Sequence, residues 1–237
     1  MPNTNKAARK AARKSKRKLT QEKVANERSP NQPLTIEWRT PGQKAAWQLM
    51  EKNAITFLLG SAGSGKTFLA MAYAINEVIQ QKRSQIILTR PIVDAGEKLG
   101  FLPGTFGEKV NPYMQPLYDT MDLLLGKFSK AREQINKAIV LAPLCYMRGR
   151  TFHDAICIFD EAQNATYAQL KLFLSRFGQN TQVLVTGDPK QSDLPGPDIA
   201  LVDVVEKLKG VPSIGAHRFS NDDVVRHPIV AAILKKL

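Results

Sequence analysis

Short apolar runs recur along residues 34–237 and are separated by polar stretches. The runs are continuous and do not alternate with polar residues, which is typical of strands covered on both faces of a sheet. Six of them are predicted to be strands, at residues 55–59, 85–89, 138–142, 155–159, 182–186 and 213–217. With helices between them, the pattern predicts an α/β fold with an open, mostly parallel sheet and helices on both faces. The ligand site of such a sheet lies at the carboxyl ends of the strands.

Local signals predict two helices near the start of this region. Thr40 and Pro41 mark a helix start, because Thr is a favoured N-cap and Pro is tolerated at the first helical position. The apolar stripe of this helix is expected to comprise Ala45, Ala46, Leu49 and Met50. A second helix is expected from about Lys66 to Gln80, directly after a glycine-rich segment.

Residues 91–129 do not follow the alternation of strands and helices. Glycine and proline are frequent in this segment, which favours turns over regular elements. The residues concerned are Gly96, Gly100, Pro103, Gly104, Gly107, Pro112 and Pro116. We expect a loop followed by an inserted helical hairpin, which is either simple connecting material or a functional surface.

Positive charge is concentrated at the N-terminus. The chain of 237 residues has a formal net charge of +13, and residues 1–28 carry ten Lys and Arg against two Glu, a net of +8. Residues 1–33 are polar and end in Ser-Pro-Asn-Gln-Pro, so we interpret them as a basic, mobile arm and linker, followed by one domain at residues 34–237. Such an arm favours contact with a polyanion such as nucleic acid, although a solubilising tail has the same composition.

The remaining composition indicates a protein of the reducing cytoplasm. No apolar run approaches the roughly 18 residues of a membrane-spanning helix, and the charged N-terminus lacks the apolar segment of a secretory signal. Cys145 and Cys157 form neither a disulfide framework nor a metal-ligand spacing. Cys157 lies in an apolar run and is expected to be buried. We therefore expect cytoplasmic localisation and no membrane partner.

The glycine-rich segment after the first strand has the pattern of a phosphate-binding loop. It reads Gly60-Ser61-Ala62-Gly63-Ser64-Gly65-Lys66-Thr67. Successive backbone N–H groups of such a loop surround an anion, and the following helix directs its positive end to the same place. Lys66 is predicted to reach the β- and γ-phosphates of ATP, and the Thr67 hydroxyl is predicted to ligate Mg²⁺.

Two neighbouring carboxylates follow the strand at residues 155–159. Asp160 is expected to hold Mg²⁺ through water, and Glu161 to orient and deprotonate the attacking water. The reverse assignment, with Asp160 as the base, is the weaker one because Mg²⁺ needs the carboxylate nearest the strand. This pair is the second part of the predicted catalytic site.

A third polar segment, Gly187-Asp188-Pro189-Lys190-Gln191, follows the strand at residues 182–186. It places the Gln191 amide near the γ-phosphate end of the predicted site. Gln191 could hydrogen-bond the γ-phosphate and report its loss to a neighbouring surface. The alternative is a Gly-Asp-Pro turn with no role in the chemistry.

Several segments together resemble one family. The phosphate loop, residues 160–164 and residues 186–191 resemble the nucleotide-binding motifs of superfamily 1 helicases. Three further segments resemble the PhoH family of phosphate-starvation ATPases more specifically. They are residues 89–104 (TRPIVDAGEKLGFLPG), 146–152 (YMRGRTF) and 223–228 (DVVRHP). The resemblance covers about residues 35–237 and implies a single RecA-like P-loop ATPase domain, without the second domain of a helicase.

The resemblance also implies roles for residues outside the three motifs. Superfamily 1 helicases complete their ATP site with arginines of a second domain, so a neighbouring subunit of a hexameric ring would supply that arginine here. Arg226 is the first candidate for it and Arg218 the second; the alternative for Arg226 is an ordinary surface arginine. Gln43 matches a glutamine that reads adenine. Arg90 and the loop after it match a segment that contacts single-stranded nucleic acid, or form a subunit contact.

Three functions are compatible with these patterns. The first is Mg²⁺-dependent ATP hydrolysis coupled to RNA or single-stranded DNA, as in a helicase or translocase. The second is a nucleotide-dependent assembly or regulatory ATPase that moves no nucleic acid. A small-molecule kinase is disfavoured because Glu161 suits the activation of water and because the Gln191 segment has no role there.

Overall fold

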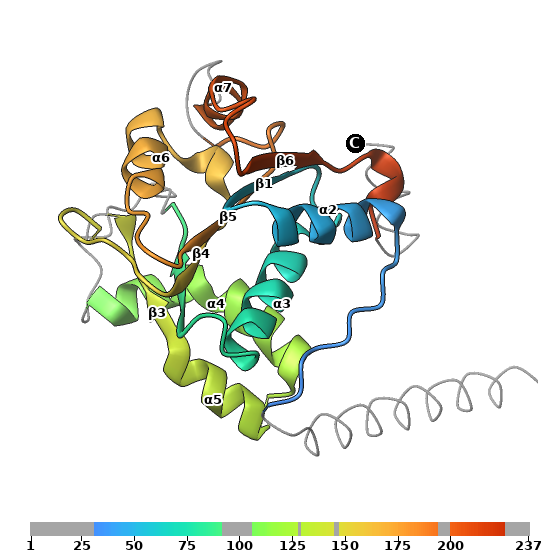
Figure 1. Cartoon of the computed structure of the whole chain (residues 1–237), viewed down its shortest axis with the longest axis vertical. Helices are drawn as coiled ribbons and strands as arrows, with labels where there is room; N and C mark the ends of the chain where they lie inside the picture. Colours follow the sequence, from blue (N-terminus) through green and yellow to red (C-terminus); the bar gives the residue numbers. More distant parts are fainter. Residues whose placement is uncertain (1–30, 92–105, 128, 145–146, 194–199, 226–237) are drawn as a thin grey trace, which may run out of the picture.

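One parallel sheet forms the centre of the molecule (Figure 1). The computed structural model describes residues 31–91, 106–127, 129–144, 147–193 and 200–225, and only the backbone of residues 106–111. Its strands are β1 (Ile55–Leu59), β2 (Gln85–Thr89), β3 (Ile139–Leu141), β4 (Ala155–Phe159), β5 (Gln182–Gly187) and β6 (Ile214–Arg218). Their order across the sheet is β3-β2-β4-β5-β1-β6, and each neighbouring pair is parallel.

Helices cover both faces of this sheet. They are α2 (Pro41–Lys52), α3 (Lys66–Ile79), α4 (Phe106–Leu125), α5 (Lys130–Ala138), α6 (Tyr167–Leu174) and α7 (Ala200–Lys207), with short 3-10 helices η3 (Ala162–Asn164) and η4 (Asn221–Asp223). Helices α2 to α5 pack on one face, and α6 and α7 on the other (Figure 1). The three-layer α/β arrangement expected from the sequence is confirmed.

The strands divide their side chains between two cores. In β1, Leu58 joins the core under α2 to α5, whereas Phe57 and Leu59 join the core under α6 and α7. In β4, Ile156 and Ile158 face the first core. Burial on both faces explains why these strands are continuous apolar runs in the sequence.

The start of α2 follows the predicted local signals. The hydroxyl of Thr40, the N-cap, accepts a hydrogen bond from the backbone N–H of Gln43 at 3.2 Å, and Pro41 is the first helical residue. Ala46 and Met50 of the expected stripe are buried. Ala45 is exposed, so its inclusion in the apolar stripe of α2 was wrong.

Helix α4 continues through two prolines, although their presence suggested turns. Pro112 and Pro116 both lie inside it and both are exposed. The opposite side of α4 is buried at Met114, Leu117 and Met121, with the spacing of a helix face that packs on a core. Water can therefore satisfy the carbonyl groups that the prolines leave without a partner.

Element ends differ from the expected ones by a few residues. Ala138, expected in a strand, is the last residue of α5, and β3 is limited to Ile139–Leu141. The second helix of the hairpin, α5, lies beyond residue 129, where the insertion was expected to end. Within the described residues, no helix is both long and apolar enough to span a membrane.

The register of the sheet brings four distant segments to one edge. Leu59 of β1 pairs with Gly187 of β5, and Phe159 of β4 pairs with Thr89 of β2. The residues that follow these strand ends are Gly60, Asp188, Asp160 and Arg90. They belong to the predicted phosphate loop, the Gln191 segment, the carboxylate pair and the Arg90 segment.

Candidate functional site

The loop between β1 and α3 is held by backbone contacts and by glycine. The N–H of Gly60 donates to the carbonyl of Gly187 at 3.1 Å, which fixes the loop to the end of β5. Gly65, the N-cap of α3, has a left-handed backbone with φ of 89°. A Cβ atom at this position would lie 3.1 Å from Nε2 of Gln43, so both conformation and space favour glycine.

Lys66 lies at the mouth of this loop. Its ammonium group donates to the carbonyl oxygens of Gly60 at 2.6 Å and of Ser61 at 3.0 Å. Because α3 begins at Lys66, the positive end of the helix dipole points at the same space. The loop therefore presents backbone amides, one ammonium group and a helix N-terminus to an anion.

The carboxylate of Asp160 is buried between two hydroxyl groups. The side chain of Thr67 donates to its Oδ1 at 2.7 Å, and the side chain of Thr186 donates to the same oxygen at 2.6 Å. The exposed fraction of Asp160 is only 2%. Within the described residues no lysine or arginine forms an ion pair with it. A buried carboxylate without a basic partner fits a site for a cation.

Glu161 is held in an unusual backbone conformation. Its φ of 53° and ψ of 41° lie in the left-handed region, which is uncommon for a residue with a side chain. Its Oε2 accepts a hydrogen bond from Nε2 of Gln163 at 2.6 Å. Its Oε1 lies 3.6 Å from NH2 of Arg90. Both oxygens of this carboxylate therefore have a partner.

The segment after β5 turns back into the site. The N–H of Gln191 donates to the carbonyl of Asp188 at 3.0 Å, and the N–H of Lys190 donates to Oδ1 of the Asp188 side chain at 3.0 Å. Asp188 is 4% exposed, and its Oδ2 has no hydrogen-bond partner among the described residues. These hydrogen bonds form a turn from Asp188 to Gln191 directly after β5.

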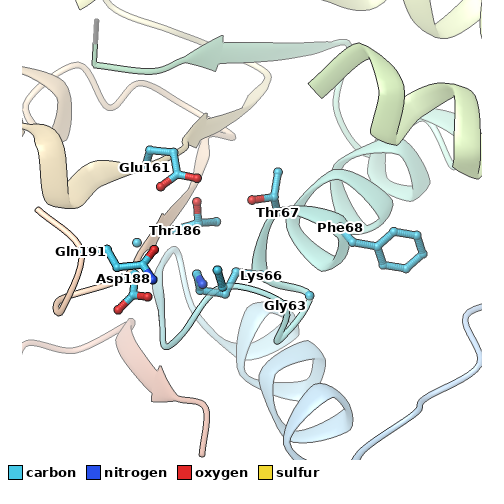
Figure 2. Close-up of a pocket in the computed structure, with 11 residues that line it drawn as sticks. Gly63, Lys66, Thr67, Phe68, Glu161, Thr186, Asp188 and Gln191 are labelled. Atoms are coloured by element: carbon cyan, nitrogen blue, oxygen red, sulfur yellow. The ribbon is translucent and has the colours of Figure 1, made fainter. Parts of the chain in front are cut away.

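One cavity of about 270 Å³ brings these groups together. Figure 2 shows Lys66 and Thr67 on one side and Glu161, Asp188 and Gln191 on the other. The remaining lining residues are Ala62, Gly63, Gly65, Phe68, Thr186 and Gly187. The lining residues therefore come from the glycine-rich loop, the start of α3, the segment after β4, the end of β5 and the segment after β5.

A second cavity of about 540 Å³ adjoins the first. Gly63, Gly65 and Phe68 line both, so the two cavities meet at the glycine-rich loop. Its wall has an apolar part and a polar part. The apolar part comprises Leu34, Ile36, Phe68, Leu123, Leu124 and Val225, and the polar part Thr35, Glu37, Arg39 and Gln43. Its size and apolar lining suit a planar organic group.

Gln43 lines the second cavity, but both ends of its amide are already bonded to the backbone. Its Nε2 donates to the carbonyl of Ser64 at 3.2 Å, and its Oε1 accepts from the N–H of Arg39 at 3.0 Å. The side chain is buried. In this geometry Gln43 connects α2 to the phosphate loop. Its amide retains one further donor hydrogen and one further acceptor lone pair.

Of the two candidate arginines, Arg218 is the one that the structure describes. Arg226 lies outside the described residues. Arg218 ends β6, where its half-exposed side chain forms an ion pair with Glu206 at 3.3 Å. Val225 donates its N–H to the carbonyl of Gly63 at 3.0 Å, so the described chain ends in contact with the phosphate loop.

The chain was compared with known protein families. A family model described as "PhoH-like protein" matches residues 35–237. The chain belongs to the PhoH-like family. The family resemblance inferred from the motifs is therefore confirmed, and it covers the whole sheet and the first cavity of this PhoH-like chain.

Relatives from several bacteria are similar to this PhoH-like chain. The PhoH-like protein of Bacillus subtilis (strain 168) is 46% identical over 202 residues, which cover 85% of this chain and 63% of that protein. Protein PhoH of Escherichia coli (strain K12) is 43% identical over 192 residues, which cover 79% of this chain and 54% of that protein. The chain thus spans little more than half the length of these relatives.

A solved structure with the same fold is the large terminase from a thermophilic bacteriophage. It superposes with a TM-score of 0.50 and 12% sequence identity, covering 86% of this chain and 50% of that chain. At this identity the likeness concerns the fold alone. Together with the parallel sheet, it confirms the RecA-like P-loop fold expected for the PhoH-like chain.

Three side chains of the site have contacts that the sequence did not predict. Thr186 is a partner of Asp160, and Gln163 and Arg90 are partners of Glu161. Gln163 lies two residues after Glu161, and Thr186 and Arg90 lie at strand ends, which are signals that could have drawn attention to them. Arg90 was expected to face nucleic acid or another subunit, and the structure places it beside Glu161.

Proposed function

We propose that this protein binds ATP with Mg²⁺ and hydrolyses the bond between its β- and γ-phosphates. The observation that carries the proposal is the contact between Thr67 and Asp160 at the foot of a glycine-rich loop that also presents Lys66. A hydroxyl and a buried carboxylate at this distance are a donor set for one hard cation beside a phosphate site. Lys66 would neutralise charge on the β- and γ-phosphates.

The residues fit a magnesium ion better than a metal bound by protein alone. Mg²⁺ keeps several water ligands and is bound by few side chains plus phosphate oxygens. No group of three or more His, Cys, Asp and Glu residues that could hold a metal occurs in the described part of the chain. Thr67 and Asp160 would hold the ion, and when bound it would neutralise the phosphate charge that develops during hydrolysis.

Glu161 and Gln191 would act at the γ-phosphate end of the cavity. The Glu161 carboxylate lines this cavity and is partly exposed, so it can contact a water molecule and accept its proton. Gln191 lines the same cavity from the segment after β5. Its amide would donate to the γ-phosphate and respond to its loss.

The nucleoside would extend from the phosphate loop into the second cavity. Phe68, Gly63 and Gly65 line the passage between the two cavities. The apolar wall would contact the flat faces of the base, while Gln43 lies beside it. We propose that Gln43 reads the adenine edge with the donor hydrogen and the acceptor lone pair that its two backbone hydrogen bonds leave available.

Coupling to RNA or single-stranded DNA is the second part of the proposal. It is supported by the net charge of +13, by the basic residues 1–28 and by the helicase-like motifs. Arg148, Arg150 and Lys171 are exposed and form no ion pair within the described chain, so they are available to a polyanion. The alternative is a regulatory ATPase whose cycle changes its assembly state and which moves no nucleic acid.

We propose further that copies of the chain assemble into a hexameric ring, in which each ATP site receives an arginine from a neighbouring subunit. Arg226 is the first candidate and Arg218 the second. An arginine donated by a neighbour can accelerate hydrolysis about 10³- to 10⁵-fold. The ring, like the nucleic-acid partner, is proposed from the motifs and is independent of the phosphate site itself.

ATP turnover by the full chain, with and without RNA or single-stranded DNA, tests the proposal. We expect Lys66→Ala to lose nucleotide binding, and Glu161→Gln to bind ATP but hydrolyse it very slowly. Retained turnover in Glu161→Gln would show that Glu161 is not the base. Stimulation by nucleic acid supports the coupled function, whereas turnover that is indifferent to it favours the regulatory one.

A further inference from the structure

The position of Glu161 is not explained by its own burial or by its local sequence. Its side chain is 37% exposed, and its left-handed backbone conformation costs free energy for a residue that is not glycine. Such a conformation persists only where surrounding contacts determine it. The carbonyl of Glu161 accepts a hydrogen bond from the N–H of Asn164 at 3.0 Å, and its carboxylate is held by two side chains, Gln163 and Arg90.

Gln163 connects Glu161 to the segment after β5. It is 3% exposed, and its amide is used at both ends. Nε2 donates to Oε2 of Glu161 at 2.6 Å, and Oε1 accepts from the backbone N–H of Asp188 at 3.0 Å. A single rigid amide therefore joins the carboxylate to the turn that carries Gln191.

Further hydrogen bonds hold the same two segments together. Ser192 donates its hydroxyl to the carbonyl of Gln163 at 3.1 Å. The side chain of Asn164 donates to Asp193 at 2.8 Å and accepts from the N–H of Asp193 at 2.8 Å. The turn after β5 and helix η3 are thus one hydrogen-bonded unit, with Glu161 at one end and Gln191 close to the other.

Arg90 holds the other oxygen of Glu161 from the neighbouring strand. Its NH2 lies 3.6 Å from Oε1 of Glu161, and its NH1 donates to the carbonyl of Tyr113 in α4 at 3.3 Å. The paired residues Thr89 and Phe159 bring the ends of β2 and β4 together, which places the arginine beside the glutamate. The guanidinium group therefore links Glu161 to α4.

We propose that Gln163 and Arg90 are positioning residues that together fix the carboxylate of Glu161 for the activation of water. This inference rests on the proposed ATPase function and deepens it. Neither residue touches the substrate in this role. Gln163 aligns Glu161 with the turn that carries Gln191. When Gln191 loses its contact with the γ-phosphate, the position of the Glu161 carboxylate therefore changes. Arg90 aligns it with α4.

Variants of Gln163 separate its two hydrogen bonds. Gln163→Met removes both, whereas Gln163→Glu keeps an acceptor for Asp188 but has no amide to donate to Glu161. In the full chain with ATP and Mg²⁺, we expect each to lower kcat about 10- to 100-fold, because a small misplacement of a catalytic group has effects of this size. The dissociation constant of a fluorescent ATP analogue should change less than about threefold, since the phosphate loop is untouched.

Matched controls and a double-mutant cycle distinguish positioning from general damage. Gln115 is an exposed glutamine of α4, bonded only to Asp119 in the described structure, and Gln115→Met should leave kcat unchanged. Arg90→Met should lower kcat and Arg90→Lys should restore part of it, whereas Lys137→Met, which removes an exposed ion pair with Glu133 on α5, should have no effect. In the Glu161→Gln background, Gln163→Met and Arg90→Met should cause no further loss, because the group that they position is already absent.

A measurement without turnover tests the geometry separately. Gln163→Met should speed hydrogen exchange at the Asp188 amide and in η3, whereas Gln163→Glu should leave Asp188 protected. Unchanged exchange in Gln163→Met, unchanged kcat, or equal losses with and without Glu161 would overturn the positioning role. Full turnover in Glu161→Gln with the expected exchange pattern would instead refute the proposed base while leaving the hydrogen-bonded unit intact.

Discussion

Asp160 carries a buried carboxylate that depends on two hydroxyl groups. Thr67 comes from the phosphate loop and Thr186 from β5, and both donate to the same oxygen. Of the two, Thr67 is also a proposed ligand of Mg²⁺, so its hydrogen bond must rearrange when the ion binds. Thr186 can keep its bond throughout, which makes it the lasting support of Asp160.

We expect Thr186→Val to destabilise the protein by about 1–3 kcal/mol, because it leaves a buried acceptor with one donor fewer. Unfolding in urea measures this change. The control is Thr120→Val, whose hydroxyl bonds the carbonyl of Pro116 on the solvent side of α4 and whose effect should stay within about 0.5 kcal/mol. Equal losses in the two variants would contradict the role of Thr186.

Cys157 gives a prediction for alkaline pH. Burial in β4 raises the pKa of its thiol to about 12. The unfolded thiol ionises above its ordinary pKa of about 8.5, while the folded one stays neutral, so stability falls as pH rises from there towards 12. At pH 10 this amounts to about 2 kcal/mol relative to pH 7. The difference in unfolding free energy between wild type and Cys157→Ala should therefore change by this amount between pH 7 and pH 10. A difference that is the same at both pH values would contradict the prediction.

The residues of the phosphate loop and the carboxylate pair could be predicted because their spacing in the sequence is itself a signal. Gln163 and Arg90 could not be assigned to Glu161 in the same way. Arg90 meets Glu161 only because β2 and β4 are neighbours in the sheet. The bonds of Gln43 to the loop and to Arg39 likewise depend on how α2 packs.

Among the elements, α4 joins the inserted segment to the core. Leu117 is 1% exposed and lies in the core under α2 to α5, whereas Leu123 of the same helix is 76% exposed. We expect Leu117→Ala to cost about 2–5 kcal/mol of stability, since it leaves a cavity in a packed core. Leu123→Ala should cost within about 0.5 kcal/mol in the same urea titration. Similar losses at both positions would mean that α4 is not packed as described.

The elements that could be predicted are those with a strong two-sided pattern. Strands β1, β2, β4 and β5 are buried along almost their whole length, and their apolar runs marked them within a residue or so. A helical hairpin was expected within residues 91–129, but the bounds of α4 could not be predicted, because its two prolines are tolerated on the side that faces water. The start of β3 was misplaced because α5 runs directly into it.

At the scale of the whole molecule, the proposed ring predicts complementation between two defective chains. Arg226→Ala should bind ATP with normal affinity and lose turnover, because the arginine would serve a neighbouring site. Lys66→Ala should be inactive because it lacks the ammonium group that binds the β- and γ-phosphates. Mixed rings would contain some sites with a complete set of groups, so turnover should rise above that of either variant alone.

The mixing experiment is read from ATP turnover at several ratios of the two variants. The control partner carries both Lys66→Ala and Arg226→Ala, and it should give no gain because it offers neither a phosphate site nor the arginine. No gain at any ratio with the single variants would contradict sites shared through Arg226, and the same design with Arg218→Ala tests the second candidate.

The placement of β1 between β5 and β6 sets an order on the biogenesis of the site. β1 pairs with strands that follow it by more than a hundred residues, Ile55 with Val183 and Ile55 with Ile214. A nascent chain on the ribosome therefore contains the glycine-rich loop long before β5 and β6, the strands that pair with β1, have been synthesised. Chains truncated before residue 182 should not bind nucleotide. ATP binding by a growing chain should begin only when β5 and β6 have paired with β1.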